Sequence, residues 1–213
     1  LFKHIRIIII TTSSIALFLP GLAAQGILDD IAVVEIRETL GFSEEQASLL
    51  ADLKERYQEQ SAALNGKIPT ANSPAARKDL VRKMTDHALA CRADVKEILS
   101  GEQFAGLQAH HVEWLEANRK ADQPDYRNLL NMTPEQALQF LALLSVYQPG
   151  IQKFKGELQE AEGLREKRKI SKSLKPLREE MDALIEGILD ESQYQLWKSI
   201  QKERRAEMRK AMM

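Results

Sequence analysis

The segment FSEEQA, residues 42–47, recurs as MTPEQA at residues 132–137, and these two stretches decide how the chain folds. In each, a hydroxyl residue stands three positions before a glutamine, which is the pattern of a capping box at the start of a helix. The hydroxyl accepts a hydrogen bond from the glutamine amide, and the glutamine side chain accepts one from the amide of the hydroxyl residue. Pro134 suits the first helical position, where its missing N–H costs nothing. Helix starts are therefore predicted at Ser43 and Thr133.

The same spacing appears once more in each half of the chain. From position 46 to position 103 is 57 residues, and from 136 to 193 is also 57. Two motifs that repeat with one shift of 90 residues predict an internal duplication. The predicted capping residues are Ser43, Gln46, Ser100, Gln103, Thr133, Gln136, Asp190 and Gln193.

Apolar residues follow each predicted helix start at steps of three and four, which is the period of one helix face. No stretch of useful length alternates apolar and polar residues as a strand does, and the chain has only 10 Gly and 7 Pro. We therefore expect an all-α fold of long antiparallel helical hairpins in two duplicated units, with an extra leading helix over residues 27–40. The expected breaks lie at 65–74, at 123–124 and, as a kink, at 149–150.

Charge and composition exclude several classes of function. The chain has 30 Lys and Arg against 31 Asp and Glu, whereas a dedicated nucleic-acid-binding domain is clearly basic. Its single cysteine cannot form an internal disulfide, so packing alone must hold the fold. The sequence contains no nucleophile elbow, no phosphate-binding glycine loop and no HExxH pair. We expect neither an enzyme nor a nucleic-acid partner.

The first 24 residues, LFKHIRIIIITTSSIALFLPGLAA, have the pattern of a secretory signal peptide. Lys3 and Arg6 precede an apolar run at 7–19, which is shorter than the roughly 20 residues needed to span a bilayer. An N-terminal membrane anchor is the alternative, because it shares this pattern. We expect export to the periplasm without stable membrane insertion after cleavage. The predicted division is signal peptide 1–24, first helical unit 25–122 and second helical unit 123–213.

One group of polar residues could carry metal chemistry. His87 and Cys91 are four residues apart and share a helix face, and His110 lies at a similar height on the next helix of the hairpin. Their counterparts 90 residues later are all apolar, which predicts core positions that need polar partners. Imidazole and thiolate suit zinc or copper. The alternative is a helical seam that tolerates polar residues, with no cofactor.

The four helix starts resemble the motif of the LTxxQ periplasmic family of the Spy/CpxP type. The likeness rests on FSEEQ at 42–46, LSGEQ at 99–103, MTPEQ at 132–136 and LDESQ at 189–193. None contains the literal Leu-Thr pair, and the chain carries two units where the family has one. The resemblance implies a helical ATP-independent chaperone or envelope-stress regulator that binds unfolded or partly folded proteins. It also implies a homodimer or, with two units in one chain, a monomeric pseudo-dimer. Related proteins bind or sense heavy metals, which is the alternative function.

Binding of unfolded clients requires apolar side chains that stay exposed and are rimmed by charge. Large residues on the helical seams are the candidates, although such a stripe normally faces a core. The candidate client-binding residues are Leu50, Trp114, Phe140 and Trp197.

Two stretches are strongly basic. Residues 165–178 contain seven Lys or Arg and one acid, and residues 198–213 contain six basic residues and two acids. Each is either a cationic surface for acidic partners or lipid headgroups, or a solvated helix face.

Overall fold

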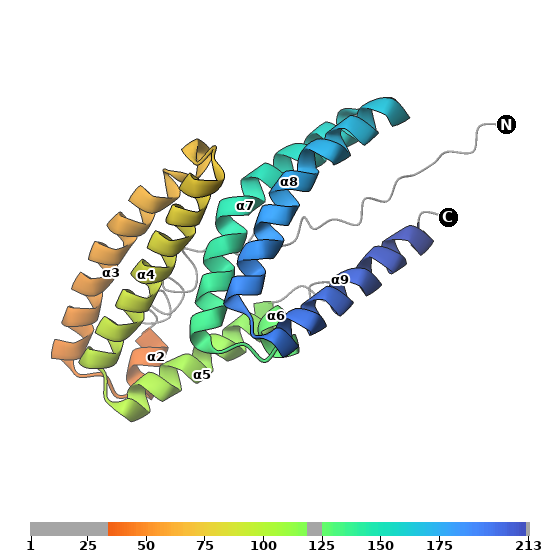
Figure 1. Ribbon diagram of the computed structural model, residues 1–213. Helices are drawn as coiled ribbons and strands as arrows, with labels where there is room; N and C mark the ends of the chain where they lie inside the picture. The colour runs from red at the N-terminus through yellow and green to blue at the C-terminus, as the bar shows by residue number, and fades with distance from the viewer. Residues whose placement is uncertain (1–33, 119–124, 212–213) are drawn as a thin grey trace.

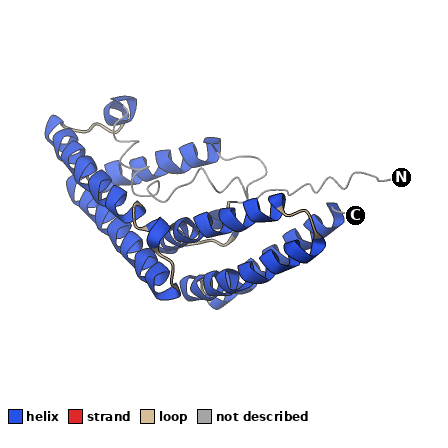
Figure 2. Cartoon of the chain, turned by 90° about the horizontal axis from the view of Figure 1, so that it is seen from above, coloured by secondary structure: helices blue, strands red, loops and turns tan. Residues whose placement is uncertain are grey.

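The computed structural model describes residues 34–118 and 125–211, and within these ranges every regular element is a helix. The all-α prediction is confirmed. Figure 2 shows long helices joined by loops. The elements are α2 (Val34–Thr39), α3 (Glu44–Asn65), the 3-10 turn η2 (Ile68–Thr70), α4 (Pro74–Ile98), α5 (Gly101–Asn118), α6 (Tyr126–Leu129), α7 (Pro134–Glu160), α8 (Leu164–Ile188) and α9 (Glu191–Ala211).

Two antiparallel hairpins form the body of the protein, α3 with α4 and α7 with α8 (Figure 1). The hairpins stand side by side because α4 packs against α7, so the long helices follow one another in the order α3, α4, α7, α8. Helices α5 and α9 continue from the ends of α4 and α8, and α9 diverges from α8 along its length (Figure 1). The outermost long helices of this row are therefore α3 and α8.

All four predicted capping boxes are present. Ser43 Oγ accepts a hydrogen bond from the Gln46 amide at 3.1 Å, and Gln46 Oε1 accepts one from the Ser43 amide at 3.0 Å. The other boxes make the same two hydrogen bonds: Ser100 with Gln103, Thr133 with Gln136, and Asp190 with Gln193. The predicted helix starts are confirmed because the capping box is a local structure that needs only residues three positions apart.

The first core fills the space between α3, α4 and α5. The apolar seam of α3 supplies Leu50 and Leu53, which are 0% and 4% exposed. These residues meet the C-terminal half of α4 and the first two turns of α5. The remaining buried residues of this core are Ile36, Tyr57, Ala88, Cys91, Val95, Leu99, Phe104 and Leu107.

The second core contains residues from both halves of the chain. Leu80, Val81 and Met84 of α4 pack together with residues of α7, α8 and α9. The two predicted units are therefore joined by a shared apolar core along α4 and α7. The predicted boundary at 122–123 and the predicted signal peptide at 1–24 lie outside the described residues.

The predicted helix breaks are partly reproduced. Helix α3 ends at Asn65 and α4 begins at Pro74, as expected. The kink expected at 149–150 falls inside α7, which continues through Pro149 and is curved in Figure 1. Of the expected leading helix, α2 is the described part, and positions 123–124 lie outside the described residues. In the described ranges no helix has both the length and the apolar character of a membrane span.

Candidate functional site

The glutamines of the first two capping boxes, at the starts of α3 and α5, also bind each other. Gln46 Nε2 donates to Gln103 Oε1 at 2.9 Å, and Gln103 Nε2 donates to Gln46 Oε1 at 3.2 Å. The same amide nitrogens donate to backbone carbonyls, Gln46 to that of Ile98 and Gln103 to that of Gly41, both at 3.0 Å. The pair therefore fixes the start of α3, the end of α4 and the start of α5 to one another.

The second hairpin contains an equivalent pair. Gln136 Nε2 donates to Gln193 Oε1 at 2.8 Å, and Gln193 Nε2 donates to Gln136 Oε1 at 3.2 Å. The carbonyls of Ile188 and Asn131 accept the other hydrogen bonds at 3.0 and 3.1 Å. Each partner stands 90 positions after its counterpart in the first hairpin. The equal 57-residue spacing of the glutamines predicted a duplication, whereas the contact between them is found only in the structure.

A surface pocket of about 660 Å³ lies beside the first glutamine pair, between α3 and α4. Its apolar lining comes from Leu49, Leu53 and Ile98. Leu49 is 47% exposed, whereas Leu53 at 4% belongs to the core below. The polar lining consists of Glu45, Gln46, Arg56, Asp94 and Glu97. Apolar side chains next to charges of both signs suit a peptide segment of mixed character.

The charged rim of the pocket is organised around Asp94. Arg56 Nη2 lies 2.9 Å from Asp94 Oδ2, and the buried Tyr57 hydroxyl donates to the same oxygen at 3.0 Å. Burial and the hydrogen bond to Asp94 raise the pKa of Tyr57 to about 12, so the phenol remains a neutral donor. Because Arg56 and Tyr57 both bind Oδ2 of Asp94, they hold this carboxylate at the edge of the pocket.

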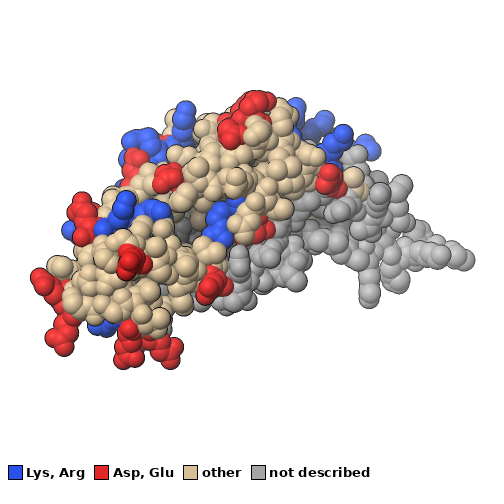
Figure 3. Space-filling view, turned by 90° about the horizontal axis from the view of Figure 1, so that it is seen from below, with Lys and Arg blue, Asp and Glu red and all other residues tan. Residues whose placement is uncertain are grey.

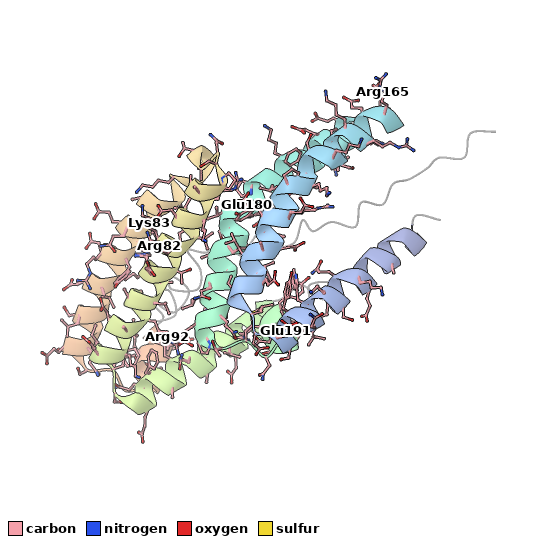
Figure 4. The ribbon with its side chains drawn as sticks, viewed as in Figure 1. Arg82, Lys83, Arg92, Arg165, Glu180 and Glu191 are labelled. Atoms are coloured by element: carbon pink, nitrogen blue, oxygen red, sulfur yellow. The ribbon has the colours of Figure 1, made fainter. Side chains whose placement is uncertain are left out.

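The second hairpin uses a different carboxylate for the corresponding tyrosine. The hydroxyl of Tyr147 donates to Glu180 of α8, which also accepts two hydrogen bonds from Arg77 of α4 at 2.6 and 3.1 Å. The side chains of Arg77 and Glu180 are only 16% and 18% exposed. Figure 4 shows Glu180 on the part of α8 that lies beside α7. This ion pair links the first hairpin to the second.

The structure does not gather the predicted metal ligands into a site. His87 Nε2 is hydrogen-bonded to Ser61 Oγ at 2.8 Å, and its ring packs against Tyr57 with centroids 4.8 Å apart. Cys91 is 1% exposed, and burial raises the pKa of its thiol to about 12, so it packs as a small apolar group. His110 lies half-buried on α5. In the described part of the chain, no three His, Cys, Asp or Glu side chains are grouped to hold a metal ion.

The candidate client-binding residues are mostly in the cores. Leu50, Phe140 and Trp197 are 0%, 4% and 6% exposed, because each lies on a seam that faces a neighbouring helix. They cannot form an exposed apolar surface in this conformation, which corrects the prediction. The side chain of Trp114 lies outside the described residues. The large apolar side chains that are exposed in the described ranges are Leu49, Leu129 and Leu196.

Comparison of the chain with protein-family models, with curated proteins and with solved structures found no match. The resemblance to the LTxxQ family thus rests on the four motifs and their spacing. The structure supplies a physical reason for glutamine at the motif positions. An amide both donates and accepts, so two of them can pair in both directions, whereas two carboxylates could not.

Proposed function

We propose that this protein is a non-catalytic helical binding protein of the periplasm that holds unfolded or partly folded polypeptides, as a chaperone or an envelope-stress regulator. The observation that carries the proposal is the pocket between α3 and α4, in which Leu49 stays exposed among charged residues. The four glutamine motifs and the signal-like residues 1–24 support the same assignment.

The pocket offers two kinds of attraction to an unfolded segment. Burial of apolar area on Leu49 and Ile98 favours binding by roughly 25 cal/mol per Å² of surface removed from water. Glu45, Glu97 and Arg56 then offer charges of both signs at the rim. Contacts of this type are adaptable, and they require no cofactor and no covalent step.

An aggregation assay tests this function. A denatured client is diluted into buffer with the purified protein, and light scattering is followed at equimolar ratio. We expect the wild-type protein to suppress aggregation and the Leu49→Ser variant to suppress it less, because the apolar contact is lost. Leu196→Ser removes an equally exposed leucine, on α9, and serves as the matched control. No suppression by the wild type overturns the function, and full suppression by Leu49→Ser overturns the assignment to this pocket.

A further inference from the structure

The two helices that meet between the hairpins each have an equivalent helix at an end of the row. Inside the chain, the second helix of one hairpin, α4, packs on the first helix of the next, α7. The helix related to α4 by the 90-residue shift is α8, and the helix related to α7 is α3. Both are end helices of this row of four, and Figure 1 shows α9 starting beside the C-terminal end of α8 and then diverging from it.

The face of α7 that meets α4 differs from the related face of α3 in charge. Ala142 and Ser145 of α7 are each only 3% exposed, and α7 packs on α4 as well as on α8. Their counterparts on α3 are Asp52 and Glu55, and both are exposed. The neighbouring Arg56 already pairs with a carboxylate of α4 at 2.9 Å. This α3 face is therefore predominantly acidic, and Figure 3 shows acidic side chains gathered at the end of the molecule where α3 lies.

On α8, the face equivalent to the one by which α4 contacts α7 carries basic side chains. Its charge is opposite to that of the α3 face. Val81 and Thr85 of α4 are 8% and 6% exposed, and Val81 belongs to the core that α4 shares with α7. Their counterparts on α8 are Ser171 and Lys175, both exposed, and the half-buried Lys167 lies one turn before Ser171. Lys175 Nζ lies 3.4 Å from Glu179 Oε1 on the same helix. The α8 side chains in the second core, among them Leu177, Met181 and Ile185, lie on a different side of the helix from this basic face.

We infer that the α8 face of one molecule docks on the α3 face of a second copy, repeating between molecules the α4–α7 contact within the chain. Across this contact, α8 of the first molecule takes the place of α4. Helices α3 and α4 of the second copy take the places of α7 and α8. The intramolecular contact is apolar, while the intermolecular one joins basic to acidic side chains. Such a head-to-tail contact uses two different surfaces, so it builds an open chain or closes into a ring.

This assembly goes beyond the proposed function, and it affects access to the pocket. Leu49 and Arg56 line the pocket and also lie on or beside the acidic α3 face. A docked copy would cover them, so self-association and client binding compete. The association is also salt-sensitive, because exposed charges are screened once salt shortens the Debye length.

Sedimentation velocity with charge-reversed variants tests the inference. The wild-type protein at low salt is expected to sediment as more than one chain, and to dissociate at high salt. The double variants Asp52→Lys with Glu55→Lys, and Lys167→Glu with Lys175→Glu, place like charges on both docking faces. Each is expected to sediment as a single chain when alone. An equimolar mixture of the two variants restores an attractive pairing and is expected to associate.

The matched control reverses two basic residues on another side of α8. Lys169→Glu with Lys172→Glu changes the net charge equally but lies outside the line of Lys167, Ser171 and Lys175 along α8, so it is expected to associate like the wild type. A wild-type protein that sediments as one chain at low salt overturns the inference. So does a mixture of the two variants that remains dispersed, or a control that dissociates as far as the Lys167/Lys175 variant. None of these measurements uses a client, so they leave the proposed function to its own assay.

Discussion

Gln46 and Gln103 lie 57 residues apart in the sequence, and their side-chain amides are hydrogen-bonded to each other in both directions. Each glutamine also closes its own capping box. A local helix signal and a tertiary contact thus depend on the same two side chains. Loss of one amide should therefore affect two helix starts.

We expect Gln46→Ala to lower the free energy of unfolding by about 2 kcal/mol. The substitution removes the hydrogen bond that caps the Ser43 amide, the one to the Ile98 carbonyl and both hydrogen bonds to the Gln103 amide, and an unsatisfied polar group costs about 1–3 kcal/mol. Urea denaturation followed by circular dichroism measures the change. Gln60→Ala, on the exposed side of α3, is the control and should change stability by no more than about 0.5 kcal/mol.

A double-mutant cycle separates the pairing from the capping. The loss in Gln46→Ala/Gln103→Ala should be smaller than the two single losses added together, with a coupling of about 0.5–3 kcal/mol. The cycle on Gln136 and Gln193 should give a similar value because the hydrogen-bond lengths match. Strict additivity in both cycles would show that the amides act only as independent caps.

Glu180 should make stability depend on pH in the acid range. Burial alone raises its pKa, but the hydrogen bonds and charge of Arg77, together with the Tyr147 hydroxyl, lower the pKa more, and the net shift is downward. A carboxyl group with a folded pKa below its unfolded value stabilises the protein above the unfolded pKa of about 4.3, and this stabilisation is lost as pH falls through the folded pKa.

The measurement is thermal unfolding from pH 7 down to pH 3. Glu180→Gln should be less stable than the wild type at pH 7, and its melting temperature should fall less steeply on acidification. Glu179→Gln, whose side chain is 65% exposed, should keep the wild-type slope. Parallel curves for wild type and Glu180→Gln would contradict the assigned role of the ion pair.

Cys91 should react slowly with thiol reagents in the native protein. Its side chain is 1% exposed, and burial raises the pKa of the thiol to about 12, so almost no thiolate is present at neutral pH. A colorimetric disulfide reagent should modify it at pH 7 only as fast as the first core opens, and much faster in denaturant. Rapid modification of the folded protein would place this thiol nearer the surface.

Two glycines should respond to alanine in opposite directions. Gly187 lies inside α8, and the methyl group of an alanine there would meet open space, so Gly187→Ala should stabilise the helix by about 0.5–1 kcal/mol. Gly41 has a φ of +64°, where an L side chain is strained, so Gly41→Ala should destabilise by about 1–2 kcal/mol. Thermal or urea unfolding of both variants gives the comparison, and equal signs would contradict it.

The helix starts could be predicted because each depends on residues three positions apart. The burial of the seams could not be predicted in the same way. Leu50, Phe140 and Trp197 were candidates for an exposed surface, but neighbouring helices cover them. Leu49, one residue before Leu50, stays 47% exposed because it lines the open pocket between α3 and α4 instead of entering the core below it. A sequence pattern shows that a helix has an apolar side, and only packing decides how wide the covered side is.

By itself the sequence determined the all-α class, the four capped helix starts and the break between α3 and α4, since all of these follow from local hydrogen bonds and from apolar period. Only the tertiary structure decided that the glutamines pair and that α4 lies on α7. The reason lies in the side chains that meet. Ala142 and Ser145 are small and can be buried against α4, whereas Asp52 and Glu55 at the related positions of α3 keep their charges in water.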